Sequence, residues 1–305
     1  MAEKYYRDYA DFIGERFGVK MQKLSVNTGR SCPNRDGTIG RGGCSYCNNV
    51  AFTPGYCLAS DSIAVQLEKG RLFFGRKYPE MRYLAYFQSY TSTHGGFESF
   101  RSACREALSV DGIDGLVVGT RPDCFDRMVA RFLGDIRRDG KFVMVEFGAE
   151  SAHDSTLRRV NRCHRWADTV GAVGIARDEG LCTGVHLIMG LPGETESMML
   201  HTVDAVNLLH PDTVKFHQLQ IVSDTPLARS VASGEEVVTP WTLDAYLDFC
   251  CKAVGRLDPA IAIERFTSQS PGDMLISPRW GLKNYEFVHR LERLLAEKGI
   301  RQGVN

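Results

Sequence analysis

The sequence predicts an α/β fold, a partial (β/α)6 TIM barrel followed by a C-terminal extension. The main observation is that short apolar segments alternate with helical stretches in six successive strand–helix units, which indicates a parallel sheet. The chain of 305 residues also shows no internal repeat, low-complexity tract or long linker. In such barrels the chemistry lies at the carboxyl ends of the strands, so those ends are where we look for functional residues.

The first half of the predicted barrel contains three strand–helix units. Each strand is a short run of apolar, β-branched or aromatic residues, and a longer stretch with helical spacing follows it. The predicted strands are 23–27, 83–88 and 115–119, and the predicted helices are 61–77, 97–109 and 125–138.

The second half repeats the pattern. Its strands are 142–147, 182–189 and 213–217, and its helices are 152–160, 166–179 and 195–209. The fifth strand leads into Gly-Leu-Pro-Gly-Glu-Thr at 190–195, where the glycines permit a tight passage and Thr195 caps the following helix.

The remaining segment contains two more predicted helices, 242–257 and 284–297, and a candidate seventh strand at 260–263. We therefore expect an N-terminal segment over 1–22, the barrel over 23–220, and an extension over 221–305 that closes the open side of the barrel.

A glycine-rich loop after the first strand carries three cysteines, Cys32, Cys44 and Cys47, in a C-x11-C-x2-C pattern. A loop with so few apolar side chains needs another source of order, and thiolates at this spacing converge on one metal centre. Two interpretations remain open at this point. One is an iron–sulfur cluster with one iron left free, and the other is a zinc site with a fourth ligand such as Cys57 or a histidine.

Tyr46 directly before the last cysteine, and Asn-Arg-Asp-Gly-Thr at 34–38, resemble the radical S-adenosylmethionine (SAM) superfamily. The wide first gap resembles the branch that contains the Elongator catalytic subunit, and within it the bacterial YhcC/YtqA-type proteins. The resemblance runs from about Arg7 to about Glu292. It implies a partial barrel whose [4Fe–4S] cluster, held by Cys32, Cys44 and Cys47, cleaves SAM to a 5′-deoxyadenosyl radical for hydrogen abstraction. It also implies a partner protein that supplies one electron.

The same resemblance implies a set of SAM-binding residues. Tyr46 would lie beside the adenine, and Arg162 in Asn-Arg-Cys-His would pair with the SAM carboxylate, because a guanidinium binds carboxylates bidentately. Gln88 stands where most members have a Gly-Gly-Glu motif that binds the methionine amine. Glu150 replaces a glutamine of the branch. His186 either reaches the ribose or is a core histidine.

Three further residues are candidates for the substrate end. Arg121 either binds substrate or pairs with Asp123, and pairing is the favoured interpretation. Lys215 and His217 share one face of the sixth strand, because alternate residues of a strand point the same way, and such inward polar side chains need partners or a ligand. Cys163 stands where the branch has glycine.

Composition constrains location and partners. The chain has 37 basic and 37 acidic residues, so no overall basic excess favours nucleic acid. Seven basic residues could form a local patch or could be ordinary surface charges, and both interpretations stay open. They are Arg7, Arg16, Lys20, Lys23, Arg71, Arg76 and Lys77. No apolar run is long enough to cross a membrane, and the first nine residues do not resemble a secretion signal, so we expect a cytoplasmic protein with reduced cysteines.

The substrate is open. The Elongator subunit modifies the wobble uridine of tRNA, so the resemblance favours a tRNA substrate. The alternatives are a radical SAM enzyme for a small molecule or peptide, and a zinc or iron–sulfur protein without catalysis. Nothing in the sequence indicates an oligomeric state.

Overall fold

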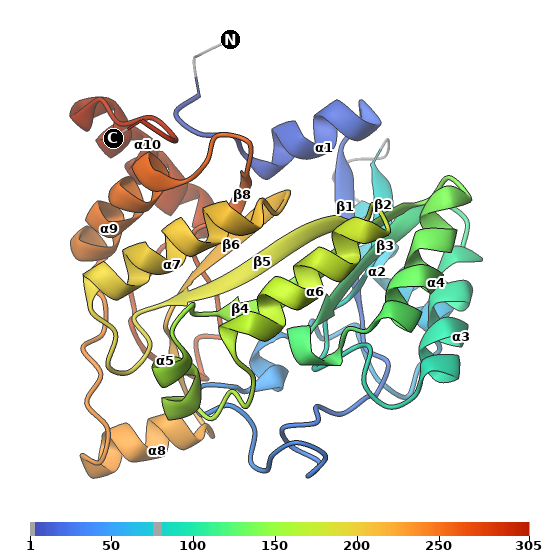
Figure 1. Cartoon of the computed structure of the whole chain (residues 1–305), viewed down its shortest axis with the longest axis horizontal. Coiled ribbons are helices and arrows are strands. Elements are labelled where there is room, and N and C mark those ends of the chain that lie inside the picture. The colour runs from blue at the N-terminus through green and yellow to red at the C-terminus, as the bar shows by residue number, and fades with distance from the viewer. Residues whose placement is uncertain (1–3, 76–80, 305) are drawn as a thin grey trace.

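The structure is a computed structural model that describes residues 4–75 and 81–304. Its centre is a seven-stranded sheet in which every neighbouring pair is parallel, in the order β1-β2-β3-β4-β5-β6-β8 (Figure 1). The strands are β1 (Met21–Val26), β2 (Arg82–Phe87), β3 (Ile113–Thr120), β4 (Phe142–Glu150), β5 (Cys182–Met189), β6 (Thr213–Gln218) and β8 (Ala262–Arg265). Two short strands, β7 (Ile221–Val222) and β9 (Leu275–Ser277), pair antiparallel beside it.

Helices connect successive strands, and most of them cover the outer face of the sheet, as α6 and α7 do in Figure 1. The connecting helices are α2 (Ile63–Gly75), α3 (Phe97–Leu108), α4 (Arg127–Arg138), α5 (Asp154–Arg159), α6 (Trp166–Asp178), α7 (Glu196–Leu209), α8 (Pro226–Ser233) and α9 (Leu243–Arg256). Helix α10 (Asn284–Lys298) packs against α9, and two short 3₁₀ helices, η1 (Asn49–Phe52) and η2 (Pro122–Cys124), lie in loops.

The sheet separates an apolar layer from a polar interior. In β1, Leu24 and Val26 face outward and are buried with Ile63 and Leu67 of α2, in the main hydrophobic core. Because strand side chains alternate between faces, Lys23 and Ser25 point into the barrel. Thus the two faces of one strand carry different chemistry, and the interior face supplies the polar residues of the site.

Helix α1 (Tyr9–Phe17) closes one end of the barrel. Its buried Phe12 and Ile13 pack on Ala262, together with residues at the first positions of β1, β4 and β5. Phe17 contacts the ring of Phe142, the first residue of β4, with centroids 5.2 Å apart. The amino-terminal ends of the strands are therefore plugged by an apolar helix face, and only their carboxyl ends remain for a site.

The predicted order of six strand–helix units is confirmed, and the candidate seventh strand is present as β8. This strand belongs to the same sheet, because it pairs with β6, so part of the segment 221–305 completes the barrel. The structure adds α1, α8 and the β7–β9 pair, which the sequence analysis did not predict. Positions 76–77 of the predicted helix 61–77 lie outside the described residues. None of the helices in the described ranges is both long and apolar enough to cross a membrane.

Candidate active site

The cysteine loop after β1 is held by its own backbone and by the segment after β4. The amide of Gly43 donates to the carbonyl of Asn34 at 2.8 Å, and the amide of Ser45 donates to the carbonyl of Val160 at 2.9 Å. A Cβ atom at Gly40 would overlap Oδ1 of the buried Asn34, so only glycine fits at that position. The loop is thus folded back over the carboxyl ends of the strands.

A cavity of about 230 Å³ lies between this loop and the strand ends. Cys32, Cys44 and Cys47 all line it, Cys32 and Cys44 being buried and Cys47 half-buried. The other predicted residues on its wall are Tyr46, Gln88, Arg121, Glu150, Arg162, His186 and His217. Ten of the eleven predicted site residues therefore meet in one cavity, although they come from six separate parts of the chain.

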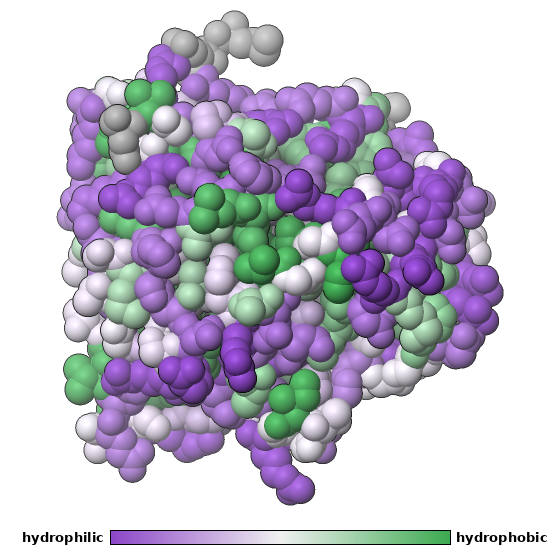
Figure 2. Space-filling model, in the orientation of Figure 1, coloured by the Kyte–Doolittle hydropathy of each residue, from purple (hydrophilic) through white to green (hydrophobic). Residues whose placement is uncertain are grey.

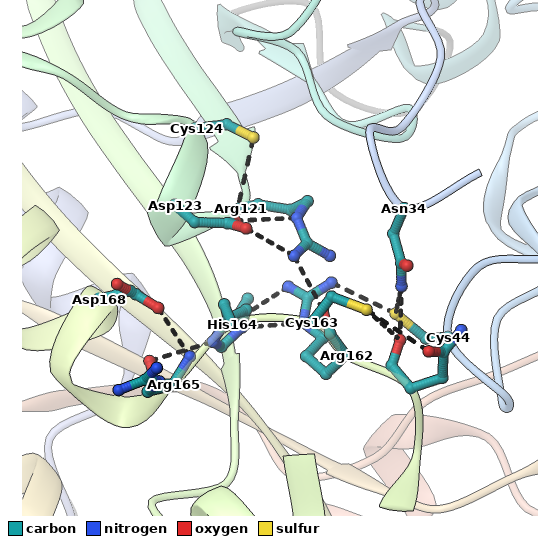
Figure 3. Close-up of polar contacts among 12 residues, drawn as sticks. Asn34, Cys44, Arg121, Asp123, Cys124, Arg162, Cys163, His164, Arg165 and Asp168 are labelled. Carbon is teal, nitrogen blue, oxygen red and sulfur yellow. Dashed lines mark hydrogen bonds and ion pairs between the residues drawn. The ribbon is translucent and has the colours of Figure 1, made fainter. Parts of the chain in front are cut away.

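The thiol of Cys44 lies among hydrogen-bond donors. Nη1 of Arg162 is 3.5 Å from its sulfur, and Nδ2 of Asn34 is 3.6 Å away (Figure 3). Burial, together with the neighbouring Cys44, raises the pKa of Cys47 to about 12. A thiolate in this position is therefore stable only beside positive charge.

Arg162 is the central residue of the polar network in Figure 3. Its Nη2 donates to the carbonyl of Gly148 at 2.7 Å and lies 3.3 Å from Oε1 of Glu150, and its Nε donates to Nε2 of His164 at 3.0 Å. Burial and the Arg162 charge lower the pKa of His164 to about 3, which keeps this ring neutral and able to accept. Burial raises the pKa of Glu150, while Arg162 opposes that change. Arg162 thus links the cysteine loop to β4.

Arg121 forms the predicted pair with Asp123. Its Nε and Nη2 donate to the two carboxylate oxygens at 2.9 and 2.8 Å, and Nη2 also donates to the carbonyl of Arg162 at 2.8 Å. Of the two interpretations of Arg121, pairing with Asp123 is therefore the one that the structure shows. Its remaining nitrogen, Nη1, is buried without a hydrogen-bond partner and lies on the wall of the cavity.

His186 and His217 form one wall of the cavity, with ring centroids 5.4 Å apart. Nε2 of His186 is 3.0 Å from Oε2 of Glu146, and Nδ1 of His217 contacts the hydroxyl of Ser268. Burial, with the nearby charge of Lys215, lowers the pKa of His186 to about 4, and burial also holds the pKa of His217 well below its ordinary value. Both rings therefore present neutral polar groups to the cavity. Gln88 accepts from the hydroxyl of Ser25 at 2.9 Å.

Lys215 does not line the cavity, and its predicted place at the substrate end is wrong. It belongs to a closed ring of four charged residues at the base of the cavity, which we call the ion ring: Lys23, Glu146, Lys215 and Glu264. Glu146 and Lys215 are buried, and Lys23 and Glu264 are half-buried. Successive nitrogen–oxygen distances around the ring are 2.6, 2.6, 3.0 and 2.7 Å. Burial opposes ionisation of Glu146, but Lys215 and Lys23 hold its pKa well below the ordinary value. Lys215 is therefore already neutralised by protein carboxylates.

The ion ring also corrects the proposed basic patch. Lys23 lies inside the barrel between Glu146 and Glu264, so it cannot belong to a surface patch. Arg7 and Arg16 pair with Glu15 and Asp212 near α1, at the end of the sheet away from the cavity. Arg76 and Lys77 lie outside the described residues.

Comparison with known proteins identifies the family. Residues 26–206 match the model of the radical SAM superfamily, and residues 211–297 match the radical SAM C-terminal domain. The chain belongs to the radical SAM superfamily. It is 36% identical over 299 residues to Protein YhcC of Escherichia coli K12, covering 98% of this chain and 95% of that protein. It is 24% identical over 192 residues to the tRNA uridine(34) acetyltransferase of Methanocaldococcus infernus, covering 61% of this chain and 34% of that enzyme.

The fold of this radical SAM protein is similar to that of the archaeal Elp3 of Methanocaldococcus infernus. The TM-score is 0.69 at 15% sequence identity, over 93% of this chain and 64% of that one. Radical SAM enzymes use a [4Fe–4S] cluster and SAM, so these two are the cofactors of this chain. Enzymes of this superfamily also need an electron donor.

The residues on the cavity wall fit a cluster and a polar cofactor. Among the described residues, Cys32, Cys44 and Cys47 are the only thiols on that wall. Nowhere in the described part of the chain are three or more histidine, cysteine or acidic side chains arranged to hold a single metal ion. Four residues of the cavity wall also carry buried polar atoms without protein partners, namely the hydroxyl of Tyr46, Oγ1 of Thr91, Nη1 of Arg121 and Nε of Arg265. Such atoms are satisfied when a polar ligand occupies the cavity.

Of the two candidates for the fourth ligand of a zinc site, Cys57 or a histidine, the structure removes Cys57. The thiol of Cys57 donates to the carbonyl of Ser25 at 2.9 Å and is not on the cavity wall. Burial raises the pKa of Cys57 to about 11, so it is a protonated structural cysteine. The vicinal Cys250 and Cys251 of α9 are likewise buried in the core, as expected from the sequence.

Glu146, Glu264, Arg265 and Ser268 were not predicted as site residues from the sequence. Glu146, Arg265 and Ser268 line the cavity, while Glu264 completes the ion ring. A signal was available for two of them, because Glu146 and Glu264 are carboxylates within strand-like apolar segments, and a buried charge needs a partner. The lysines that pair with these carboxylates could not be predicted, because they depend on which strands face one another across the barrel.

Proposed function

We propose that Cys32, Cys44 and Cys47 hold the [4Fe–4S] cluster and that the cavity binds SAM beside it. The observation that carries this proposal is that three thiols from one loop meet the carboxyl ends of the barrel strands in a single cavity. Three ligands leave one iron of a cubane open, unlike the four thiolates of ordinary electron-transfer clusters. With both cofactors bound, the site supplies a 5′-deoxyadenosyl radical that removes a hydrogen atom from the substrate.

The side chains of the cavity then have separate tasks in this proposal. Tyr46 covers the cofactor beside Cys47, and the unpartnered Nη1 of Arg121 and hydroxyl of Thr91 donate to its polar groups. Gln88 and His186 offer oxygen or ring nitrogen atoms to its hydroxyl and amine groups, while Glu150 pairs with Arg162.

In this proposal, Arg162 does more than pair with the SAM carboxylate. Its contacts with Gly148, Glu150 and Cys44 leave it little freedom to turn, so it presents fixed positive charge to the thiol and to the cavity at once. A fixed cation stabilises bound thiolate and carboxylate groups without reorganisation. The neutral His164 behind it keeps this orientation.

For the substrate, we propose a tRNA nucleoside at or near the wobble uridine. This part of the proposal is supported by the likeness to the tRNA uridine(34) acetyltransferase over 192 residues, 61% of this chain. The cavity at the carboxyl ends of the strands also has to hold the cofactor in this proposal, so it leaves room for one exposed nucleoside and not for a folded RNA, and the target base must leave its stack.

Two experiments test the proposal separately. Anaerobically reconstituted protein with a reductant should convert SAM to 5′-deoxyadenosine and methionine, and absence of cleavage in protein with a full cluster would contradict the cofactor assignment. Nucleosides from tRNA of strains with and without this gene should differ at the wobble position. Identical nucleosides alongside active SAM cleavage would instead contradict only the tRNA substrate.

A further inference from the structure

Helices α3 and α4 form a second concave surface outside the cavity. We call it the arginine groove, and it is lined by Phe97, Arg101, Arg105, Arg127, Met128, Arg131, Phe132 and Asp135, with a volume of about 520 Å³. In Figure 2, strongly hydrophilic residues cover the right-hand part of the molecule, where Figure 1 places α3 and α4. Nothing in the cofactor site explains four arginines here.

The sequence of the two helices builds two ridges of positive charge. Arg101 and Arg105 are four residues apart on α3, and Arg127 and Arg131 are four apart on α4, so each pair lies on one face, separated by about 6 Å along its helix. Arg101 pairs with Glu98, and Arg127 with Asp178 at 3.5 Å. In the described chain, Arg105 and Arg131 have no ion-pair partner, and Arg105, Arg127 and Arg131 are exposed.

The floor of the groove is aromatic. The rings of Phe97 and Phe132 meet edge to face, with centroids 5.7 Å apart, and the guanidinium of Arg101 lies 6.0 Å from the Phe97 centroid. Met128 on the α4 side is 51% exposed. Guanidinium groups bind phosphates bidentately, and unstacked bases pack on aromatic rings and arginine planes, so ridges of arginine beside phenyl rings suit a nucleic-acid strand.

The groove begins at the rim of the cavity. Phe97 and Arg127 are the first residues of α3 and α4, and the loops before them carry Thr91 and Arg121 of the cavity wall. In the same rim, Nε2 of His94 lies 2.7 Å from Oδ2 of Asp36 in the cysteine loop. A strand bound along the groove therefore ends where a flipped base would enter.

From this placement we infer that the arginine groove binds the phosphate backbone of the RNA substrate and directs one nucleoside into the cavity. The inference rests on the tRNA part of the proposed function. The main competitor is an acidic redox protein. Arginines alone would suit either partner, but the phenyl rings of Phe97 and Phe132 between the two ridges offer a stacking surface for bases, which favours a strand of RNA.

The test uses the reconstituted full chain and unmodified tRNA, with binding measured by fluorescence anisotropy at several salt concentrations. The variant is Arg105→Glu/Arg131→Glu, and the matched control is Arg290→Glu/Arg293→Glu on exposed positions of α10, which Figure 1 shows at the other side of the molecule. Each phosphate contact contributes about −0.7 to −0.9 to the slope of log affinity against log salt.

We expect the groove variant to bind tRNA at least tenfold more weakly and to lose about 1.5 from the magnitude of its slope, because two contacts are removed. The α10 control should keep the affinity of the wild type within about twofold. Uncoupled SAM cleavage should be unchanged in both variants, which shows that the barrel is intact. If Arg105→Glu/Arg131→Glu misfolds, Arg105→Gln/Arg131→Gln should show the same loss in weaker form.

Two outcomes overturn the inference. In one, the wild type binds tRNA and the groove variant binds it equally well. In the other, tRNA affinity is unchanged but cluster reduction by an acidic flavoprotein slows while reduction by dithionite does not, which would make the groove a docking site for the electron donor. Failure of the wild type to cleave SAM would contradict the proposed function instead.

Discussion

Lys23 and Glu264 come from the two edge strands of the sheet, β1 and β8, yet their side chains meet at 2.7 Å inside the barrel. The sheet is open between these strands, so no backbone hydrogen bond joins its edges. The ion ring connects them instead, with Glu146 and Lys215 as the intermediate members. Buried charges thus take over part of the role that strand pairing has in a closed barrel.

This arrangement predicts the effect of Lys23→Met. The change leaves Glu146 and Glu264 with Lys215 as the one lysine of the ring, and breaking a buried ion pair typically costs about 3–5 kcal/mol of unfolding free energy. Urea unfolding should show that loss. Lys20→Met, three residues earlier at an exposed position, should change stability by only about 0.5 kcal/mol. Equal effects of the two changes would show that the ion ring does not hold the barrel edges.

Cys44→Ala should abolish the cluster and all SAM cleavage, because the remaining Cys32 and Cys47 cannot hold three irons. Iron and sulfide content after anaerobic reconstitution measures this directly. Cys57→Ala is the matched control, since its thiol faces the carbonyl of Ser25 and should not affect the cluster. Full iron and sulfide in Cys44→Ala would refute the ligand assignment.

The pair of Glu150 and Arg162 gives a prediction about cofactor affinity. Glu150→Gln removes a carboxylate that competes for the Arg162 charge, so SAM should bind more tightly, by about 1 kcal/mol. Arg162→Ala should weaken SAM binding by about 2–3 kcal/mol, the loss typical of a charge-assisted contact. Calorimetry on reconstituted protein measures both. Weaker binding to Glu150→Gln would show that the carboxylate itself contacts SAM.

The buried histidines predict that acid destabilises the fold. The pKa of His186 is about 4 in the folded protein, where burial keeps the ring neutral, and about 6.5 in the unfolded chain. Between these values the unfolded state binds more protons, so stability falls as the pH falls from 6.5 toward 4. For His186 alone the loss between pH 7 and pH 5 is about 2 kcal/mol.

Urea unfolding of the metal-free protein at pH 7 and pH 5 tests this expectation. His186→Gln is the control, since its amide can still donate to Glu146 but does not titrate. Its stability should fall less between the two pH values than that of the wild type. An equal fall in both proteins would assign the acid sensitivity to other groups, such as His164, whose pKa is about 3 because of burial and Arg162.

Cys163 has φ +61°, in the left-handed region that costs a residue with a Cβ about 1–2 kcal/mol. Among the described residues, its sulfur is hydrogen-bonded to oxygen atoms of Asn161 and to no cluster cysteine or carboxylate. Cys163→Gly should therefore stabilise the protein by about 0.5–1 kcal/mol, as measured by urea unfolding, while Cys163→Ala should not. Loss of SAM cleavage in Cys163→Gly would mean that the thiol has a function of its own.

The strands and the cysteine loop could be predicted from the sequence because each depends on local information. Apolar runs define β2 to β6, and the spacing of Cys32, Cys44 and Cys47 carries the chemistry by itself. The capping role of Thr195 was equally local, and its side chain accepts from the amide of Met198 at 3.3 Å.

The ion ring could not be predicted in this way. Lysine is usually exposed, so Lys23 was placed on the surface, although Leu24 and Val26 already indicated a strand with its other face turned inward. The partner Glu264 lies 241 positions away, and its contact depends on the curvature of the whole sheet. Arg265 was missed for the same reason, since only the three-dimensional fold places it on the cavity wall.

The plug formed by α1 has a kinetic consequence. With Phe12 and Ile13 sealing the amino-terminal end and the ion ring filling the middle, the described part of the chain leaves the carboxyl ends of the strands as the side from which cofactor and substrate both enter. Whatever binds deeper must arrive first and depart last. We therefore expect compulsory-order kinetics in which SAM precedes the substrate, and an RNA that is already seated should slow the exchange of a spent cofactor.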